Sequence, residues 1–278
     1  MRLATVRIGG ATVAVRVEDR RAITIEGAAD VGALLEDPDW RLRAERADGA
    51  SYDLAALPDR AWAPVVPRPG KIVCVGLNYR AHIREMGREL PTYPTLFAKY
   101  PEALIGAYDP LVLPSSAPDA VDWEAELAVV IGAPARKVSE EAAELCIAGY
   151  SVLNDVTMRD WQYRSAEWFQ GKTFEGTAPF GPVLVTRDEF VVGASVEARV
   201  DGELVQSAPT DDLVFSPAQL IAYISQIFTL RPGDVIATGT PGGVGHARRP
   251  PRYLAPGMTL STSVAGIGEL RTPVVAES

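Results

Sequence analysis

The sequence predicts an α+β, β-rich fold. Many short runs of its 278 residues have the apolar patterning of β-strands, and only a few stretches have helical spacing. These elements do not alternate regularly, which argues against a doubly wound parallel sheet. Three prolines and a glycine in residues 63–70 are typical of an extended crossing. We therefore expect a small N-terminal α/β domain, residues 1–68, and a larger domain, residues 69–278.

In the N-terminal part, apolar and polar residues alternate over residues 1–27, and Gly9-Gly10 predicts a hairpin. A short helix is expected at 31–35. Residues 71–76 form a continuous apolar run, which is typical of a buried strand. A short polar stretch with helical spacing, residues 79–86, follows it.

The later helices are predicted from the residues that cap their first turns. Ser139 is placed to cap a helix that ends near residue 146, and Ser216 followed by proline predicts a helix to about residue 229. Thr157-Met-Arg-Asp160 has the form of a capping box, so a helix should carry Arg159 and Gln162 on one face. The remaining strands are expected at 95–99, 111–113, 122–132, 148–156, 183–186, 195–200, 203–206, 235–238, 258–264 and 269–275.

Composition excludes several classes of protein. Hydrophobic residues make up 47% and charged residues 23%, the profile of a soluble globular protein. The net charge of −9 disfavours nucleic acid and anionic membranes as partners. The first eight residues contain no apolar signal segment, and no apolar run is long enough to span a membrane, so a cytoplasmic protein is predicted. Cys74 and Cys146 are expected as buried thiols rather than a disulfide framework.

The strongest chemical signal is the acidic pair in Asp122-Trp-Glu-Ala-Glu126. Alternate side chains of a strand share a face, so Glu124 and Glu126 should lie together at the entry of an apolar strand. Two partly buried carboxylates repel each other, and a bound cation relieves that repulsion. The alternative is an exposed acidic strand end.

Asp155 is the third acidic candidate, because it ends a predicted strand. Together with Glu124 and Glu126 it would provide three hard oxygen ligands, a set that suits Mg²⁺ or Mn²⁺. Zinc would need histidine or cysteine, and the chain has only two of each, scattered along it. Alternatively, Asp155 is a turn or cap residue.

The chain has two histidines. His82 and Glu85 are neighbours at helical spacing, and a carboxylate beside an imidazole raises its basicity, which suits a general base. A solvated helix with a weak His–Glu pair is the alternative. His246 lies in a Pro/Gly/Arg-rich loop and is expected at the surface.

Two glycine-containing stretches resemble phosphate-binding loops. Lys172 follows Gly171 in a relaxed P-loop pattern, but Trp168 and Phe169 are too bulky for a loop that wraps phosphates. Lys172 among aromatic residues is instead a candidate oxyanion or carboxylate binder. Residues 239–245 lack the dinucleotide fingerprint and are either an anion site or a tight connection.

Taken together, these motifs resemble the fumarylacetoacetate hydrolase family, in the family's order and over roughly residues 70–275. The motifs that carry the resemblance are Val-Cys-Val-Gly-Leu-Asn-Tyr-Arg at 73–80, His82 with Glu85, Asp-Trp-Glu-Ala-Glu at 122–126, Asn154-Asp155 with Arg159 and Gln162, Gly171-Lys172, and Thr-Gly-Thr-Pro-Gly-Gly-Val-Gly at 238–245.

The resemblance implies a mixed β-roll catalytic domain, a homodimer and a bound Mg²⁺ or Mn²⁺. It implies that the metal ligands are Glu124, Glu126 and Asp155, and that His82 and Glu85 form a dyad on a lid. The residues that it implies around the substrate are Arg159, Gln162, Lys172, Tyr79, Thr240 and Gly239.

The reaction expected from this resemblance is hydrolysis of a carbon–carbon bond in a 2,4-dioxo acid, such as an acylpyruvate or fumarylpyruvate, to pyruvate and a carboxylic acid. His82, held by Glu85, would activate water, and Lys172 and Gln162 would stabilise the oxyanion. Three alternatives stay open: decarboxylation of oxaloacetate, hydration or isomerisation of a 2-oxo-alkene dioate, and a metal-binding protein without turnover.

Overall fold

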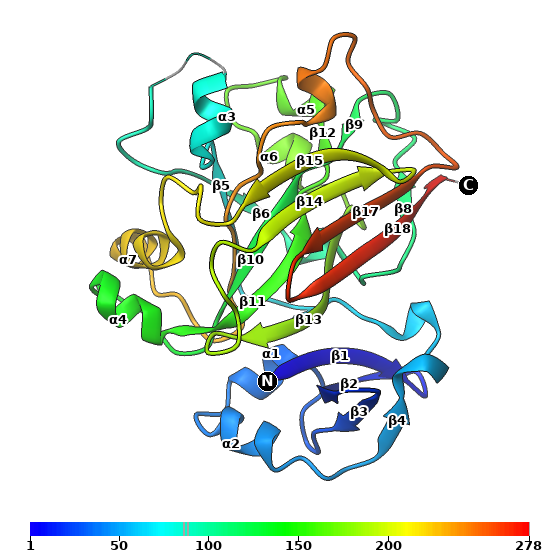
Figure 1. Cartoon of the computed structure of the whole chain (residues 1–278), viewed down its shortest axis with the longest axis vertical. Helices are drawn as coiled ribbons and strands as arrows, with labels where there is room; N and C mark the ends of the chain where they lie inside the picture. The colour runs from blue at the N-terminus through cyan, green and yellow to red at the C-terminus, as the bar shows by residue number, and fades with distance from the viewer. Residues whose placement is uncertain (86, 88, 278) are drawn as a thin grey trace.

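The computed structural model describes residues 1–85, 87 and 89–277, with the backbone alone for Glu85. Most of the described strands form one large sheet and one smaller sheet that packs across its middle (Figure 1). Few helices accompany them. The predicted α+β, β-rich class is therefore confirmed.

The large sheet runs through both halves of the chain. Its described strands are β1 (Arg2–Ile8), β2 (Ala11–Glu18), β3 (Arg21–Thr24), β4 (Ser51–Asp53), β5 (Ile72–Gly76), β6 (Thr95–Lys99), β7 (Leu104–Ile105), β10 (Ala125–Ile131), β11 (Ile147–Asn154), β13 (Ala178–Thr186) and β16 (Val235–Ala237). Their order is β4-β3-β2-β1-β13-β11-β10-β16-β5-β6, with β7 beside β13. The pairs β16–β5 and β13–β7 are parallel and the others antiparallel, so the sheet is mixed.

The smaller sheet has the order β15-β14-β17-β18-β8 in the described chain. Its strands are β8 (Leu111–Leu113), β14 (Ser195–Val200), β15 (Glu203–Pro209), β17 (Thr259–Val264) and β18 (Gly268–Ala276), while β9 (Val121–Asp122) and β12 (Thr157–Met158) form a separate short pair. Residues of β17 alternate between buried and half-buried, as expected for a sheet that packs on a core with one face.

The central strands of the large sheet are buried on both faces. Every residue of β10, β11 and β13 is buried. In β10, Leu127 and Val129 belong to the core between the two sheets, whereas Ala128 and Val130 belong to a second core on the opposite face. This two-sided burial explains why β10 reads as a continuous apolar run.

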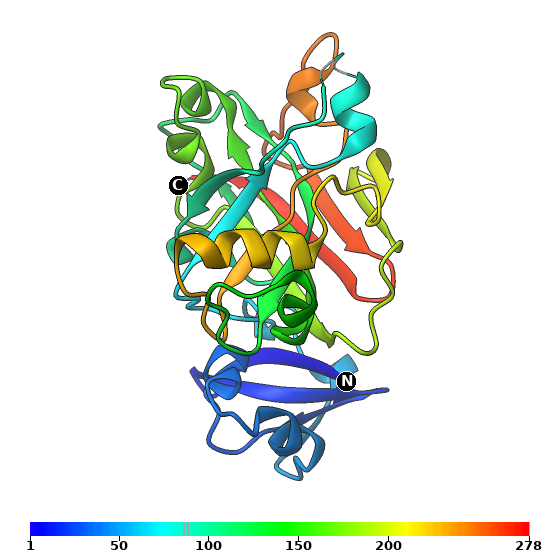
Figure 2. The same cartoon turned by 90° about the vertical axis from the view of Figure 1, so that its left-hand side faces the viewer.

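Short helices cover the edges and ends of the sheets. They are α1 (Val31–Leu35), α2 (Trp40–Glu45), α3 (Arg80–Glu85), α4 (Glu140–Leu145), α5 (Arg159–Gln162), α6 (Phe169–Lys172) and α7 (Pro217–Ile227), with 3₁₀ turns at Leu54–Ala56, Asp59–Ala61, Pro101–Ala103 and Gly245–Ala247. Helices α4 and α7 lie side by side (Figure 2). Among the described residues, no helix is both long and apolar enough to cross a membrane.

The helix-capping predictions have mixed outcomes. Ser139 and Ser216 both cap their helices as predicted, since each side chain accepts a hydrogen bond from the backbone of α4 or α7. The structure adds that Gln219 completes a capping box with Ser216. The prediction of a capping box at 157–160 is wrong. Thr157 lies in β12 and its hydroxyl donates to the Asp155 carbonyl at 2.7 Å, so it is committed to the preceding turn.

The N-terminal part shares a sheet and a core with the rest of the chain. Strand β1 pairs with β13, so it extends the large sheet. Leu3 and Leu34 pack in the same core as Phe180 and Leu184. The division into domains after residue 68 stays a prediction.

Candidate active site

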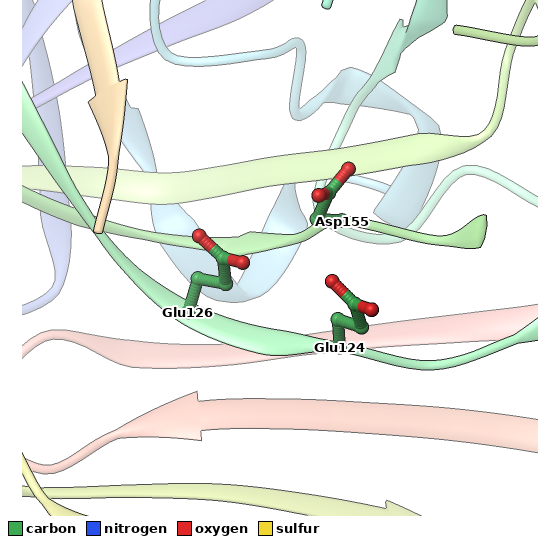
Figure 3. Close-up of side chains that lie close together, drawn as sticks. All are labelled: Glu124, Glu126 and Asp155. Carbon is green, nitrogen blue, oxygen red and sulfur yellow. The ribbon is translucent and has the colours of Figure 1, made fainter. Parts of the chain in front are cut away.

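Three carboxylates converge where β10 begins and β11 ends. Ligand atoms of Glu124, Glu126 and Asp155 all lie within 4.8 Å of one another, and all three residues are buried (Figure 3). Asp155 follows β11 directly. Glu124 lies just before β10 rather than within a longer strand, because the expected strand at 122–132 is divided into β9 and β10.

Backbone pairing places the acids opposite one another. The antiparallel register aligns Ala125 with Asn154. Beyond that pair, the Asp155 N–H donates to the Glu124 carbonyl at 2.8 Å, and the Asn154 side chain accepts from the Glu124 N–H at 3.0 Å. Strand register and one amide side chain therefore hold two of the carboxylates together.

Three buried cations of the described chain surround these acids. Lys172 Nζ lies 2.5 Å from Glu124 Oε2 and 2.8 Å from Asp155 Oδ2. Arg159 Nη1 lies 2.7 Å from Glu124 Oε1, and Lys99 Nζ lies 3.0 Å from Asp155 Oδ1. Burial lowers the pKa of Lys172, but Asp155 and Glu124 outweigh that effect and leave the pKa above its ordinary value. The ammonium is therefore kept charged.

Glu126 differs from its two neighbours. Its Oε2 accepts from the Gly239 N–H at 2.8 Å, and within the described residues it forms no ion pair. Burial, followed by the charges of Asp155 and Glu124, raises the pKa of Glu126 well above its ordinary value. A divalent cation between the three carboxylates would compensate this charge, and three oxygen ligands match what Mg²⁺ and Mn²⁺ prefer. The site therefore fits a divalent metal.

A cavity of about 300 Å³ opens onto Glu124 and Glu126 of the triad. It is lined by Val75, Gly76, Leu77, His82, Phe97, Glu124, Glu126, Arg159, Gln162, Tyr163, Trp168, Lys172, Thr240, Val244, His246 and Ala247. His82 reaches it from α3, while Arg159 and Gln162 reach it from α5 with Arg159 Nη1 donating to Gln162 Oε1 at 3.0 Å. The Glu85 side chain, and with it the predicted dyad, lies outside the described residues.

The predicted substrate-binding residues are distributed around this cavity. Thr240 lines it, and the Thr240 hydroxyl donates to the Ala125 carbonyl at 3.0 Å. Gly239 precedes Thr240 and does not line the cavity, and its backbone N–H donates to the Glu126 carboxylate. Tyr79 is buried and lines a smaller adjoining cavity of about 170 Å³ together with His82. The roles of these residues stay predictions.

His246, expected at the surface, is half-buried and lines the cavity. Its backbone N–H donates to Asp122 Oδ2 at 2.9 Å. The loop after β16 folds back onto β9, so a histidine that reads as a loop residue becomes part of the site wall.

Sequence reasoning missed two buried charged residues. Asp122 accepts from Arg159 Nε at 2.8 Å and from the Gly245 N–H at 2.7 Å, so it anchors one wall of the site. Lys99 ends β6 and also donates to the Lys172 carbonyl. Asp122 belongs to the family motif at 122–126, which gave it no role of its own. The signal for Lys99 was a charged residue at the end of an apolar run, which is common at positions without a function.

Comparison with known proteins identifies the family of this chain. The model of the fumarylacetoacetate hydrolase C-terminal domain matches residues 71–275. The chain belongs to the fumarylacetoacetate hydrolase family.

Its curated relatives include mitochondrial proteins named oxaloacetate tautomerase. The rat protein Fahd2a is 40% identical over 235 residues, which are 84% of this chain and 75% of the relative. The bovine protein FAHD2B is 43% identical over 217 residues, 77% of this chain and 68% of the relative.

Solved structures of the family match the whole chain. A fumarylacetoacetate hydrolase from psychrophilic Exiguobacterium antarcticum has a TM-score of 0.88 and 34% identity, with each chain covered over 100% of its length. A maleylpyruvate hydrolase from a Sphingobium species, solved with manganese(II) and pyruvate, has a TM-score of 0.82 and 29% identity, also with 100% coverage of both chains. The family therefore contains tautomerases as well as hydrolases on this fold.

Proposed function

We propose that this protein is a divalent-metal-dependent enzyme that interconverts the keto and enol forms of oxaloacetate. The observation that carries the proposal is the buried triad of Glu124, Glu126 and Asp155 at a cavity of only about 300 Å³, the lower end of ligand-pocket sizes. A four-carbon 2-oxo acid suits such a cavity. Identity of 40–43% to the oxaloacetate tautomerases supports the same substrate.

Glu124, Glu126 and Asp155 are the residues that would hold Mg²⁺ or Mn²⁺. A bound cation would supply a Lewis acid for the 2-oxo group. Lys172 remains charged beside Glu124 and Asp155, so it adds positive potential where the 2-oxo oxygen gains negative charge. Arg159 fixes Glu124 in place and excludes other orientations of that carboxylate.

Keto–enol conversion moves one proton. The imidazole of His82 removes a proton from carbon 3 of the 2-oxo acid, and the released electron pair forms the double bond between carbons 2 and 3. The carbonyl π electrons move to the 2-oxo oxygen, which then takes up a proton from water, while protonated His82 returns its proton to water. The reverse transfer regenerates the keto form, so the reaction is balanced without any other reactant. His82 suits this role because it lines the same cavity as Glu124 and Glu126.

Hydrolysis of a 2,4-dioxo acid is the second candidate. The match to a fumarylacetoacetate hydrolase over the full length of both chains favours it. In that reaction His82 would activate water, and Lys172 and Gln162 would stabilise the tetrahedral oxyanion.

A substrate panel separates the candidates. Fresh oxaloacetate is followed by the ultraviolet absorbance of its enol with Mg²⁺, with Mn²⁺ and with EDTA, while coupled lactate dehydrogenase measures pyruvate. We expect metal-dependent acceleration of keto–enol equilibration without matching pyruvate release. Pyruvate release at the same rate would instead indicate decarboxylation, and faster cleavage of acetylpyruvate or fumarylpyruvate would indicate the hydrolase.

A further inference from the structure

A second histidine lies in the cavity, and the proposed reaction does not use it. His246 lines the cavity with Arg159 and Thr240. Its backbone N–H and Arg159 Nε both donate to Asp122 Oδ2, at 2.9 and 2.8 Å. The shared carboxylate therefore fixes this histidine beside a buried guanidinium.

Neighbouring aromatic residues hold the imidazole in one orientation. His246 Nδ1 lies 2.8 Å from the Tyr253 hydroxyl. The ring also stacks on Tyr163, with centroids 5.3 Å apart and planes at 30°. In the described part of the chain, His246 Nε2 makes no hydrogen bond. When the Tyr253 hydroxyl donates to Nδ1, the ring proton lies on Nε2, which then is a donor available to a bound molecule.

The cationic groups around the triad are already committed to protein carboxylates. Lys172 is shared by Glu124 and Asp155. Arg159 is shared by Asp122 and Glu124. A second carboxylate on the substrate therefore needs a donor outside this network, and His246 is such a donor on the wall of the same cavity.

We propose that His246 binds the distal carboxylate of a short 2-oxo diacid, and that this contact makes the site prefer diacids to monoacids. Tyr253 positions the imidazole for this contact. The inference rests on the proposed function, because the 2-oxo acid end of the substrate is taken to lie at the triad.

The test compares two ligands that differ only at the far end. Oxaloacetate carries a carboxylate where 2-oxobutyrate carries a methyl group. Trp168 lines the cavity, so stopped-flow tryptophan fluorescence at saturating Mg²⁺ reports binding of each ligand before turnover. His246→Phe keeps an aromatic ring against Tyr163 and removes the donor, whereas His246→Gln keeps an N–H donor.

Wild-type protein should bind oxaloacetate more tightly than 2-oxobutyrate. His246→Phe should weaken oxaloacetate binding roughly tenfold, the usual effect of losing one hydrogen bond to a charged group. Binding of 2-oxobutyrate should be unchanged, and His246→Gln should retain most of the preference. His82→Ala should leave the preference intact, because that residue acts on carbon 3.

Equal weakening of both ligands by His246→Phe, or no weakening of either, would overturn the inference while leaving the proposed function standing. Failure of both ligands to bind the magnesium-loaded wild-type protein would overturn the proposed function as well. Melting temperatures of the variants separate a binding defect from a folding defect.

Discussion

Glu126 is the member of the triad that forms no ion pair with a described cation, and its charge is therefore the one most dependent on metal. Glu126→Gln keeps the shape and one acceptor oxygen but removes that charge. We expect Mg²⁺ affinity to fall at least about tenfold, since ligand charge largely sets the affinity of such sites. Isothermal titration of the metal measures it, with the exposed Glu144→Gln as the control. Unchanged affinity in Glu126→Gln contradicts the ligand assignment.

His82 should affect turnover without affecting the metal. General-base catalysis typically contributes about 10²–10⁴-fold, and His82→Ala should lose that factor in keto–enol conversion. Any decarboxylation of oxaloacetate should fall far less, because that reaction depends chiefly on the metal that withdraws electrons from the 2-oxo group. Both rates are measured at saturating Mg²⁺, together with metal affinity. A variant that converts oxaloacetate at the wild-type rate rules His82 out as the base.

At the scale of elements, the site depends on the close packing of α6 against α5. A Cβ at Gly171 would lie 2.5 Å from the Gln162 nitrogen and 2.6 Å from the Met158 carbonyl oxygen, too close for either backbone to accept. Helix α6 bears Lys172, and α5 bears Arg159. Glycine therefore lets the two short helices bring their cations to the same carboxylate.

Gly171→Ala should push these helices apart. We expect a loss of about 1–3 kcal/mol in the free energy of unfolding from overpacking, and a larger fractional loss of activity because Lys172 moves. Urea denaturation and the oxaloacetate assay measure the two effects. The exposed neighbour Gln170→Ala is the control and should change neither. Wild-type stability in Gly171→Ala would show that the helices can separate without cost.

At the scale of the whole molecule, residues 1–68 add strands to the large sheet and side chains to its second core. Removing them would expose the edge of β13 and apolar residues such as Phe180 and Leu184, an arrangement that promotes aggregation. We expect one cooperative thermal transition in calorimetry of the full chain and insoluble protein from residues 69–278 alone. Two separate transitions, or a soluble, active 69–278 fragment, would show instead that the larger domain folds without the N-terminal one.

A homodimer formed chiefly by residues after 70 is also predicted. Leu145 on α4 is 70% exposed and Ile227 on α7 is 57% exposed, and the two helices lie side by side (Figure 2). Burying such apolar side chains would stabilise association. Sedimentation at micromolar concentration should show a dimer that Ile227→Glu weakens, whereas Leu42→Glu in the N-terminal part should not. A monomeric wild-type protein with full activity contradicts this arrangement.

The sequence alone determined the features that depend on neighbours in the chain. The apolar run in β10 indicated a strand that enters a core, and Ser216 followed by proline indicated the start of α7, because both signals act within a few residues. The carboxylate spacing at Glu124 and Glu126 indicated an acidic site at the strand entry. The family motifs then indicated which distant residues belong to it.

Only the tertiary structure decided how that site is charged and closed. Asp122 joins Arg159 to the loop of His246, and Lys99 pairs with Asp155 across the large sheet. These contacts connect residues between 37 and 124 positions apart, so no local pattern contains them. A loop histidine and a lysine at a strand end are ordinary surface residues until the sheets pack, because burial and ion pairing depend on which chain segments the fold brings together.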